Sequence, residues 1–267
     1  MNNQQTSREL HEMLILRYEP IAIKLIKNED EVPGNAIRPL RDMKKHLALC
    51  QTFALTRRDK KTIYMDKLDH WCWNPLIGLG HVDCSVGTEQ FEVVCQVLGM
   101  GDVESAREFF AKFPRLPLDE YIGIVSAPLE TAEFVPDIVL IYCNNAQLRS
   151  LVWAAKLKMG RLVETELDAI DSCVWATVPS ILSGEYRVTL PDIGEYERAM
   201  AGEDEIIFSV PGWRIDEIMD GLRSFYNMRA GYSHHQRDML YDFPRPEFYK
   251  TLFEMWGLDH HGEVWDR

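Results

Sequence analysis

The segment PDIVLIY at residues 136–142 is short and apolar along almost its whole length, which is typical of a strand buried on both faces. Such a strand needs neighbouring strands beside it and helices above and below it. Further strand-like runs alternate with helix-like segments, at 21–27, 62–65, 121–127, 187–190 and 205–210. We therefore expect an α/β or α+β protein with a mixed sheet and helices packed on it, in a strand order that the sequence leaves open.

Apolar residues spaced three or four apart predict the helices, at 7–19, 41–58, 103–113, 146–158, 173–182 and 214–226. Thr6 or Ser7 is expected to cap the first helix, and Gly160 to end the fourth. In the helix at 41–58, Cys50 falls on the apolar face and is expected to point inward. The segment 68–84 is rich in aromatic, Gly and Pro residues and is expected to be a loop leading into a short helix.

The domain organisation expected is one α/β domain over residues 1–232 and a C-terminal helical arm or lid over 233–267. The tail differs from the rest because Pro244 and Pro246 precede a helix-like stretch, EFYKTLFEMW. Two histidine pairs in this tail, at 234–235 and 260–261, resemble metal ligands. Adjacent side chains point apart on helices and strands, so we do not expect either pair to share an ion.

The net charge of -13 disfavours binding to nucleic acid or to an anionic membrane surface. One short basic stretch, from Arg57 to Lys61, interrupts this acidic character. Asp59 divides it and no aromatic residues alternate with it, so a solvated helix end is the favoured interpretation. We expect neither a nucleic-acid nor a membrane partner.

The start of the chain, MNNQQTSRELHEML, lacks the basic, apolar and small-residue regions of a signal peptide. No run of 18 apolar residues occurs either. We therefore expect a cytoplasmic location, where cellular reductants keep cysteines as thiols. The six cysteines are also too sparse for a disulfide scaffold.

Three of these cysteines stand where chemistry is plausible. Cys50 lies on a predicted helix, Cys72 in the irregular aromatic loop, and Cys173 at a predicted helix start, where backbone N–H groups stabilise a thiolate. No C-x-x-C pair is present, and cysteine is a common small core residue. The residues alone leave packing and metal binding both open.

The chain resembles a known prokaryotic family over about residues 15 to 225. The segments that carry the resemblance are PIAIKLI, HLALCQTFALTRR, HWCWNPLIGLG, YIGIVSAPLETAEFVPDIVLIYCNNAQ and SCVWATVPSILSGEYRVTLPDIGEYE. They occur in the order and spacing of the family catalogued as domain of unknown function 169 (DUF169), which is frequent in anaerobes and methanogens.

The resemblance implies an iron–sulfur cluster, with the 4Fe-4S type as the leading expectation, or another metal site, held by Cys50, Cys72 and Cys173, which match recurrent cysteines of the family. Three thiolate ligands would leave one position open for Lewis-acid chemistry or substrate binding. The chain departs from the family pattern in two places: Trp73-Asn74-Pro75 follows Cys72, and the later turn reads GEYER. Substrate specificity is therefore expected to differ from that of relatives.

Further candidates surround these cysteines in the sequence. Cys84 is the candidate fourth ligand, because it follows Cys72 by twelve residues in the same irregular stretch. His70, Glu195 and Arg198 are candidate catalytic residues, with a polar contact or a solvated surface as the alternative roles. Cys95 and Cys143 lie in apolar runs and are interpreted as packing residues.

The leading hypothesis is an iron–sulfur protein of anaerobic metabolism, either a reductase-like or Lewis-acid enzyme or a redox module. Its partner would be a small-molecule substrate or a redox protein, and a homodimer is the base expectation for its assembly. One alternative is a zinc enzyme that uses the same thiolates. The other is a non-enzymatic protein that binds a small ligand or a partner, with its cysteines only in the core.

Overall fold

The computed structural model describes residues 2–160, 162–234 and 245–258. Contacts divide the chain into two units, Met1–His234 and His235–Arg267, and each unit is described by itself. The side chains of the two histidine pairs lie outside the described residues. Among the described residues, no helix is long and apolar enough to cross a membrane.

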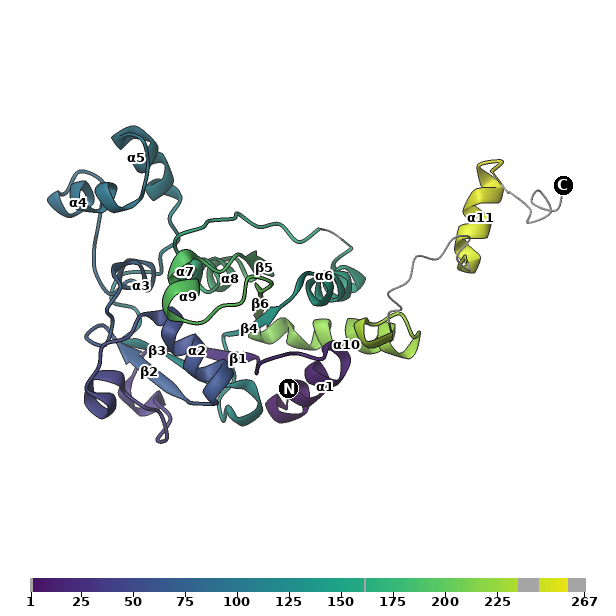
Figure 1. Ribbon diagram of the computed structural model, residues 1–267, viewed down its shortest axis with the longest axis horizontal. Coiled ribbons are helices and arrows are strands. Elements are labelled where there is room, and N and C mark those ends of the chain that lie inside the picture. The colour runs from purple at the N-terminus through teal and green to yellow at the C-terminus, as the bar shows by residue number, and fades with distance from the viewer. Residues whose placement is uncertain (1, 161, 235–244, 259–267) are drawn as a thin grey trace. The chain divides into compact units, whose positions relative to one another are not determined.

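A six-stranded sheet forms the centre of the first unit (Figure 1). Its spatial order is β2-β3-β1-β4-β6-β5, and every pairing between these strands is antiparallel. Two isolated parallel bridges, Ile37–Ile63 and Leu47–His70, lie outside these strand pairings. The strands are β1 (Ile21–Ile26), β2 (Ile63–Asp66), β3 (Gly123–Pro128), β4 (Ile138–Cys143), β5 (Arg187–Thr189) and β6 (Ile206–Pro211). The predicted α/β or α+β class, with helices packed on a sheet, is confirmed, but the sheet is antiparallel and not mixed as expected.

Strand β4 lies inside the sheet, paired with β1 on one side and β6 on the other. All six of its residues are buried, as its apolar sequence predicted. Successive side chains point to opposite faces, so Tyr142 belongs to one core and Cys143 to the other. The sheet therefore separates two hydrophobic cores.

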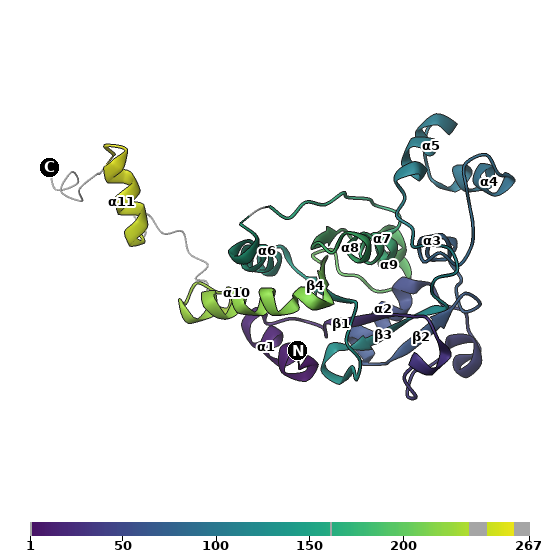
Figure 2. The ribbon, with the colours of Figure 1, turned by 180° about the vertical axis from the view of Figure 1, so that it is seen from behind.

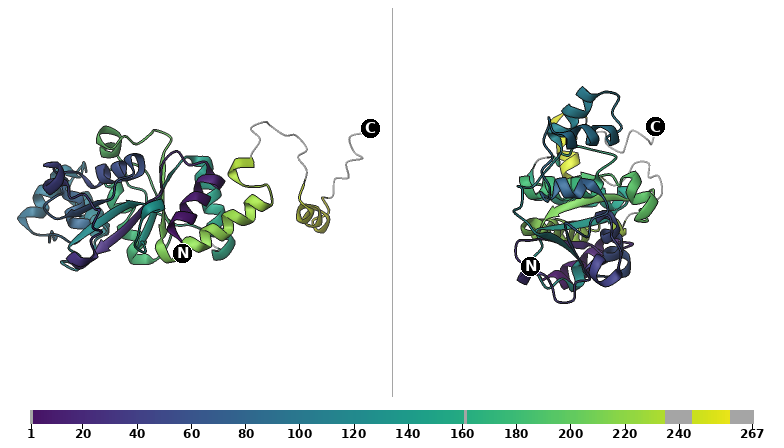
Figure 3. Two further views of the ribbon diagram at one scale, coloured as in Figure 1. Left: turned by 90° about the horizontal axis from the view of Figure 1, so that it is seen from below. Right: turned by 90° about the vertical axis from the view of Figure 1, so that its left-hand side faces the viewer.

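Helices cover both faces of the sheet (Figures 2 and 3). One core includes residues of α1 (Asn3–Leu14), α6 (Asn145–Met159) and α10 (Ile215–Asn227). The other includes residues of α2 (Leu49–Asp59), α3 (Trp73–Gly78), α4 (Glu89–Val97), α5 (Val103–Lys112), α7 (Ser172–Trp175) and α8 (Val178–Ser183). The short helix α9 (Ile193–Arg198) lies beside α2. Helices α4 and α9 were not predicted.

Two of the predicted helices have boundaries that differ from those expected. Helix α1 begins at Asn3, because the Asn2 side chain, and not Thr6 or Ser7, caps it by accepting a hydrogen bond from the Gln5 amide. It ends at Leu14, and Ile15 after it takes the left-handed conformation. Helix α2 begins only at Leu49 and not at residue 41, because the backbone of Leu47 pairs with that of the loop around His70. Cys50 therefore lies in the first turn of α2 and not along its middle.

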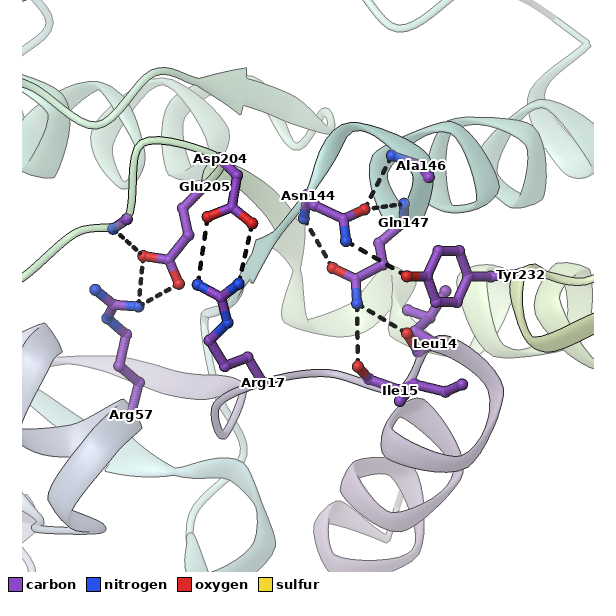
Figure 4. Close-up of polar contacts among 11 residues, drawn as sticks. Leu14, Ile15, Arg17, Arg57, Asn144, Ala146, Gln147, Asp204, Glu205 and Tyr232 are labelled. Atoms are coloured by element: carbon purple, nitrogen blue, oxygen red, sulfur yellow. Dashed lines mark hydrogen bonds and ion pairs between the residues drawn. The ribbon is translucent and has the colours of Figure 1, made fainter. Parts of the chain in front are cut away.

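The end of α1 is joined to the start of α6 by a buried amide (Figure 4). The Gln147 side chain donates hydrogen bonds to the carbonyls of Leu14 and Ile15, at 2.9 and 3.1 Å. Asn144 caps α6 through two backbone amides and donates to the Tyr232 hydroxyl. These contacts satisfy carbonyls left free at the end of α1 and fix that helix to the sheet layer.

Within the second unit, the described residues form the helix α11 (Glu247–Met255). The helix-like stretch predicted at 247–256 is therefore confirmed. Phe248, Met255 and Trp256 are largely exposed within it.

Candidate functional site

The three predicted cysteines line a single pocket of about 420 Å³ on the α2 face of the sheet. We call it the cysteine pocket. Apolar side chains form much of its wall, including Trp71, Trp73 and Ile193. Its polar and sulfur-bearing lining residues are Cys50, Cys72, Cys173, Asn74, Asp171, Asp192 and Arg198.

Each cysteine is placed by the beginning of a helix. Cys50 is the second residue of α2, Cys72 directly precedes α3, and Cys173 is the second residue of α7. The Cys72 thiol donates a hydrogen bond to the Asn74 side chain at 3.1 Å. Because these three helices pack on the same core, residues more than a hundred positions apart in the chain come together.

Burial raises the pKa of all three thiols. The pKa of Cys50 rises to about 12, and the nearby carboxylate of Glu195 adds to the rise while Arg198 opposes it. The pKa of Cys173 lies well above its ordinary value, with Cys50 and Cys72 contributing after burial, and that of Cys72 is raised as well. The thiols therefore keep their protons in the metal-free chain, and a metal that binds must displace them.

Arg198 is the pocket residue that favours thiolate formation. Its guanidinium lies near the side chains of Cys50 and Cys72, and it opposes the rise in the pKa of Cys50. Gly194 makes room for it, because a Cβ atom there would lie 2.2 Å from Arg198 Nη2. Among the three catalytic candidates, Arg198 is the one that lines the cysteine pocket.

Glu195 is buried beside the pocket but is not among its lining residues. Its carboxylate accepts hydrogen bonds from the Ser172 hydroxyl at 2.7 Å and from the Tyr142 hydroxyl at 3.0 Å. Burial raises the pKa of Glu195 to about 7, and these two hydrogen bonds oppose the rise. Its contact with Ser172 ties it to the residue that precedes Cys173, and a catalytic role stays a prediction.

Asp171 also lines the cysteine pocket, although the sequence analysis did not single it out. It is only 1% exposed, and neither carboxyl oxygen has a hydrogen-bond partner among the described residues. It stands at the N-cap position of α7 but makes no capping bond. Burial raises its pKa to about 8, with Asp168 and Asp192 contributing. An acidic residue just before a helix is a common N-cap, so its position in the sequence indicated no other role. Only its burial in the folded chain sets Asp171 apart from such a cap.

The other three cysteines lie elsewhere. Cys84, the candidate fourth ligand, is buried but does not line the cysteine pocket. Its surroundings are Arg115, whose guanidinium donates to the Cys84 carbonyl, and Cys95. Cys95 is on α4, and Cys143 is buried in the core on the opposite face of the sheet.

His70 is also separate from the cysteine pocket. Its ring lies 5.8 Å from that of His81, centroid to centroid, and both residues are 7% exposed. Neither ring nitrogen of His70 has a partner among the described residues. Burial, with a smaller contribution from His81, lowers the pKa of His70 to about 3.

This buried histidine should make the metal-free chain sensitive to acid. The folded chain keeps His70 neutral, whereas the unfolded chain binds a proton below the ordinary pKa of 6.5. Stability is therefore lost as the pH falls, by about 2 kcal/mol between pH 7.5 and pH 5. Urea unfolding at a series of pH values should show a smaller loss for His70→Phe than for the wild type. The exposed His46→Gln variant is the control, and an equal loss in His70→Phe would contradict the assignment.

The grouping of the candidate metal ligands in the pocket can be compared with the geometry that a single metal ion needs. Across the described part of the chain, no three His, Cys, Asp or Glu side chains are grouped to hold one metal ion. A tetrahedral zinc site with bonds of about 2.3 Å would need its sulfur atoms only about 3.8 Å apart. The three thiols line one pocket, and a metal or cluster bound there stays a prediction.

Comparison with known proteins gives a family without a described activity. A model of the DUF169 family, described as "Uncharacterised ArCR", matches residues 9–221. The chain is also similar to "Uncharacterized protein MJ0308" of Methanocaldococcus jannaschii, with 21% identity over 225 residues that cover 83% of this chain and 94% of the relative. No solved structure matches. Since the family model spans most of the chain, the protein belongs to the DUF169 family.

Proposed function

We propose that the chain binds an iron–sulfur cluster in the cysteine pocket, with Cys50, Cys72 and Cys173 as ligands. The observation that carries the proposal is that these three thiols, from three separate helices, line one pocket. Cysteine thiolates are the usual ligands of such clusters. The resemblance to the DUF169 family implies the same three ligands.

The surrounding residues suit a negatively charged group of iron and sulfur. Arg198 supplies a cation beside Cys50, which offsets the charge of thiolates and lowers the cost of deprotonation. Trp73 and Ile193 contribute apolar surface to the pocket wall, which limits the access of water. Such surroundings favour a cluster that is shielded from solvent yet reachable through the pocket.

A cluster held here would supply electron transfer, or Lewis-acid chemistry at an iron without a cysteine ligand. We propose a reductase-like or Lewis-acid enzyme, or a redox module, of anaerobic metabolism. Its partner would be a small-molecule substrate that enters the pocket or a redox protein that docks over it. The exposed Trp71 at the pocket wall is suited to contact either partner.

The test is metal analysis with an absorption spectrum on protein prepared without oxygen and reconstituted with iron and sulfide. We expect a brown protein with stoichiometric iron and sulfide. Cys50→Ala, Cys72→Ala and Cys173→Ala should each lose most of the visible absorption. Cys143→Ala is the matched control, because Cys143 is buried like Cys50 and Cys173 but lies on the other face of the sheet.

Three results would contradict the proposal. A colourless wild type that retains neither iron nor sulfide excludes the cluster. Stoichiometric zinc without visible absorption would instead indicate the zinc enzyme. Absorption that survives in all three cysteine variants would place the cluster elsewhere. Circular dichroism of the metal-free variants separates these results from a failure to fold.

A further inference from the structure

Two carboxyl groups line the cysteine pocket, and they differ in what they bind. Asp192 is fully engaged, since its Oδ1 accepts from the Glu195 amide at 2.8 Å and its Oδ2 from the Ser172 amide at 2.9 Å. Asp171 has no such partner for either oxygen. Asp192 therefore supports the backbone, whereas the carboxyl of Asp171 is available to a group in the pocket.

The position of Asp171 makes its lack of partners unusual. It is 1% exposed, so bulk water does not solvate its carboxyl group. Burial of a polar group without hydrogen bonds is costly, and most buried carboxyl groups are paired or bind metals. At an N-cap, an aspartate normally accepts a bond from the first turn, yet Asp171 accepts none from α7. Its side chain is positioned for a contact that the described protein atoms do not supply.

We propose that Asp171 is the fourth ligand of the cluster, bound through a carboxylate oxygen beside the three cysteines. This inference rests on the proposed function. It assigns the fourth position to Asp171 and not to Cys84, which does not line the pocket. An oxygen donor completes the ligand set without a fourth cysteine.

A carboxylate ligand has a chemical consequence. Carboxylate oxygen is a harder donor than thiolate sulfur and binds the iron of a cluster less tightly. The iron held by Asp171 is therefore the exchangeable one, where an oxygen-bearing substrate can displace the carboxylate. Arg198 lines the same pocket and would attract a substrate of negative charge. The substrate class indicated is a small anion with an oxygen donor, such as a carboxylate.

The test compares Asp171→Ala and Asp171→Cys with the wild type, all reconstituted without oxygen. The readouts are iron per chain, the electron paramagnetic resonance spectrum and the rate of iron loss to a chelator. We expect the wild type to hold four irons and Asp171→Ala to hold three. Asp171→Cys should keep four, and its most labile iron should be lost about tenfold more slowly than that of the wild type. Glu166→Gln, an exposed acid five residues before Asp171 and outside the pocket lining, is the control and should match the wild type.

Measurements on the metal-free proteins distinguish a ligand role of Asp171 from a purely structural one. If Asp171 is a ligand, metal-free Asp171→Ala should unfold at no lower temperature than the wild type, because no hydrogen bond is lost. A lower unfolding temperature together with an unchanged iron count and spectrum would overturn the inference. An unchanged iron count and spectrum at equal stability would overturn it too. In both cases the proposed function stands if the cysteine variants lose the cluster, and it fails if the wild type takes up none or if all three cysteine variants keep it.

Discussion

We expect Arg57→Met to lower the free energy of unfolding by about 3 to 5 kcal/mol. Arg57 Nη1 donates to both carboxylate oxygens of Glu205, at 2.9 and 3.0 Å, and the two side chains are 1% and 5% exposed (Figure 4). Removal of the cation leaves Glu205 charged and buried. The guanidinium also stacks on Tyr142, at 4.0 Å from the ring centroid, so packing is lost as well. Urea unfolding of the metal-free chain measures the effect.

Arg17→Met is the matched control, because Arg17 pairs with Asp204, the residue next to Glu205 (Figure 4). That pair is 56% and 55% exposed, so its loss should cost less than about 1 kcal/mol. The double variant Arg57→Met/Glu205→Leu should recover much of the lost stability, because no unpaired charge remains. If Arg57→Met costs no more than Arg17→Met, the buried pair does not have the role assigned to it.

The second prediction concerns the cation of the cysteine pocket and rests on the proposed function. We expect Arg198→Gln to weaken retention of the cluster by about 10- to 100-fold, because a group that stabilises the thiolate of Cys50 is removed. Competition with an iron chelator, followed by visible absorption without oxygen, measures the change. Gly194→Ala should act in the same direction, since its Cβ would occupy the place of the guanidinium.

Arg107→Gln on α5 is the control for this measurement, because Arg107 is outside the lining of the cysteine pocket. It should retain the cluster as the wild type does. Equal retention in Arg198→Gln and Arg107→Gln would show that the cation has no part in holding the group. A loss in both variants would point to a general effect of net charge.

Local patterns predicted most of the fold. The apolar run of β4 was identified as a buried strand, and Gly160 ends α6 in the left-handed conformation as expected. Helical periodicity gave a wrong helix start where the backbone pairs with a segment farther along the chain. Leu47 matched a helical pattern, yet its backbone pairs with that of the loop at His70. The strand order follows from packing of the whole chain and could not be derived from any one segment.

The basic stretch at the end of α2 shows that local patterns did not predict side-chain contacts with distant residues either. Arg57 was interpreted as part of a solvated helix end, and this was wrong: its partner Glu205 is 148 residues away, and the pair is buried. No local pattern contains that information. The structure likewise brings Cys50, Cys72 and Cys173 to one pocket, which their spacing alone did not predict. Asp171 was missed because burial without a partner is a property of the folded chain.

The most direct measurement is native mass spectrometry of the chain, reconstituted and handled without oxygen. We predict that the folded wild type carries the added mass of four irons and four sulfides. Cys173→Ala should appear at the mass of the bare chain, while Cys143→Ala should carry the same addition as the wild type. A wild type found only as the bare chain, or with the mass of one zinc ion, would contradict an iron–sulfur cluster in this pocket.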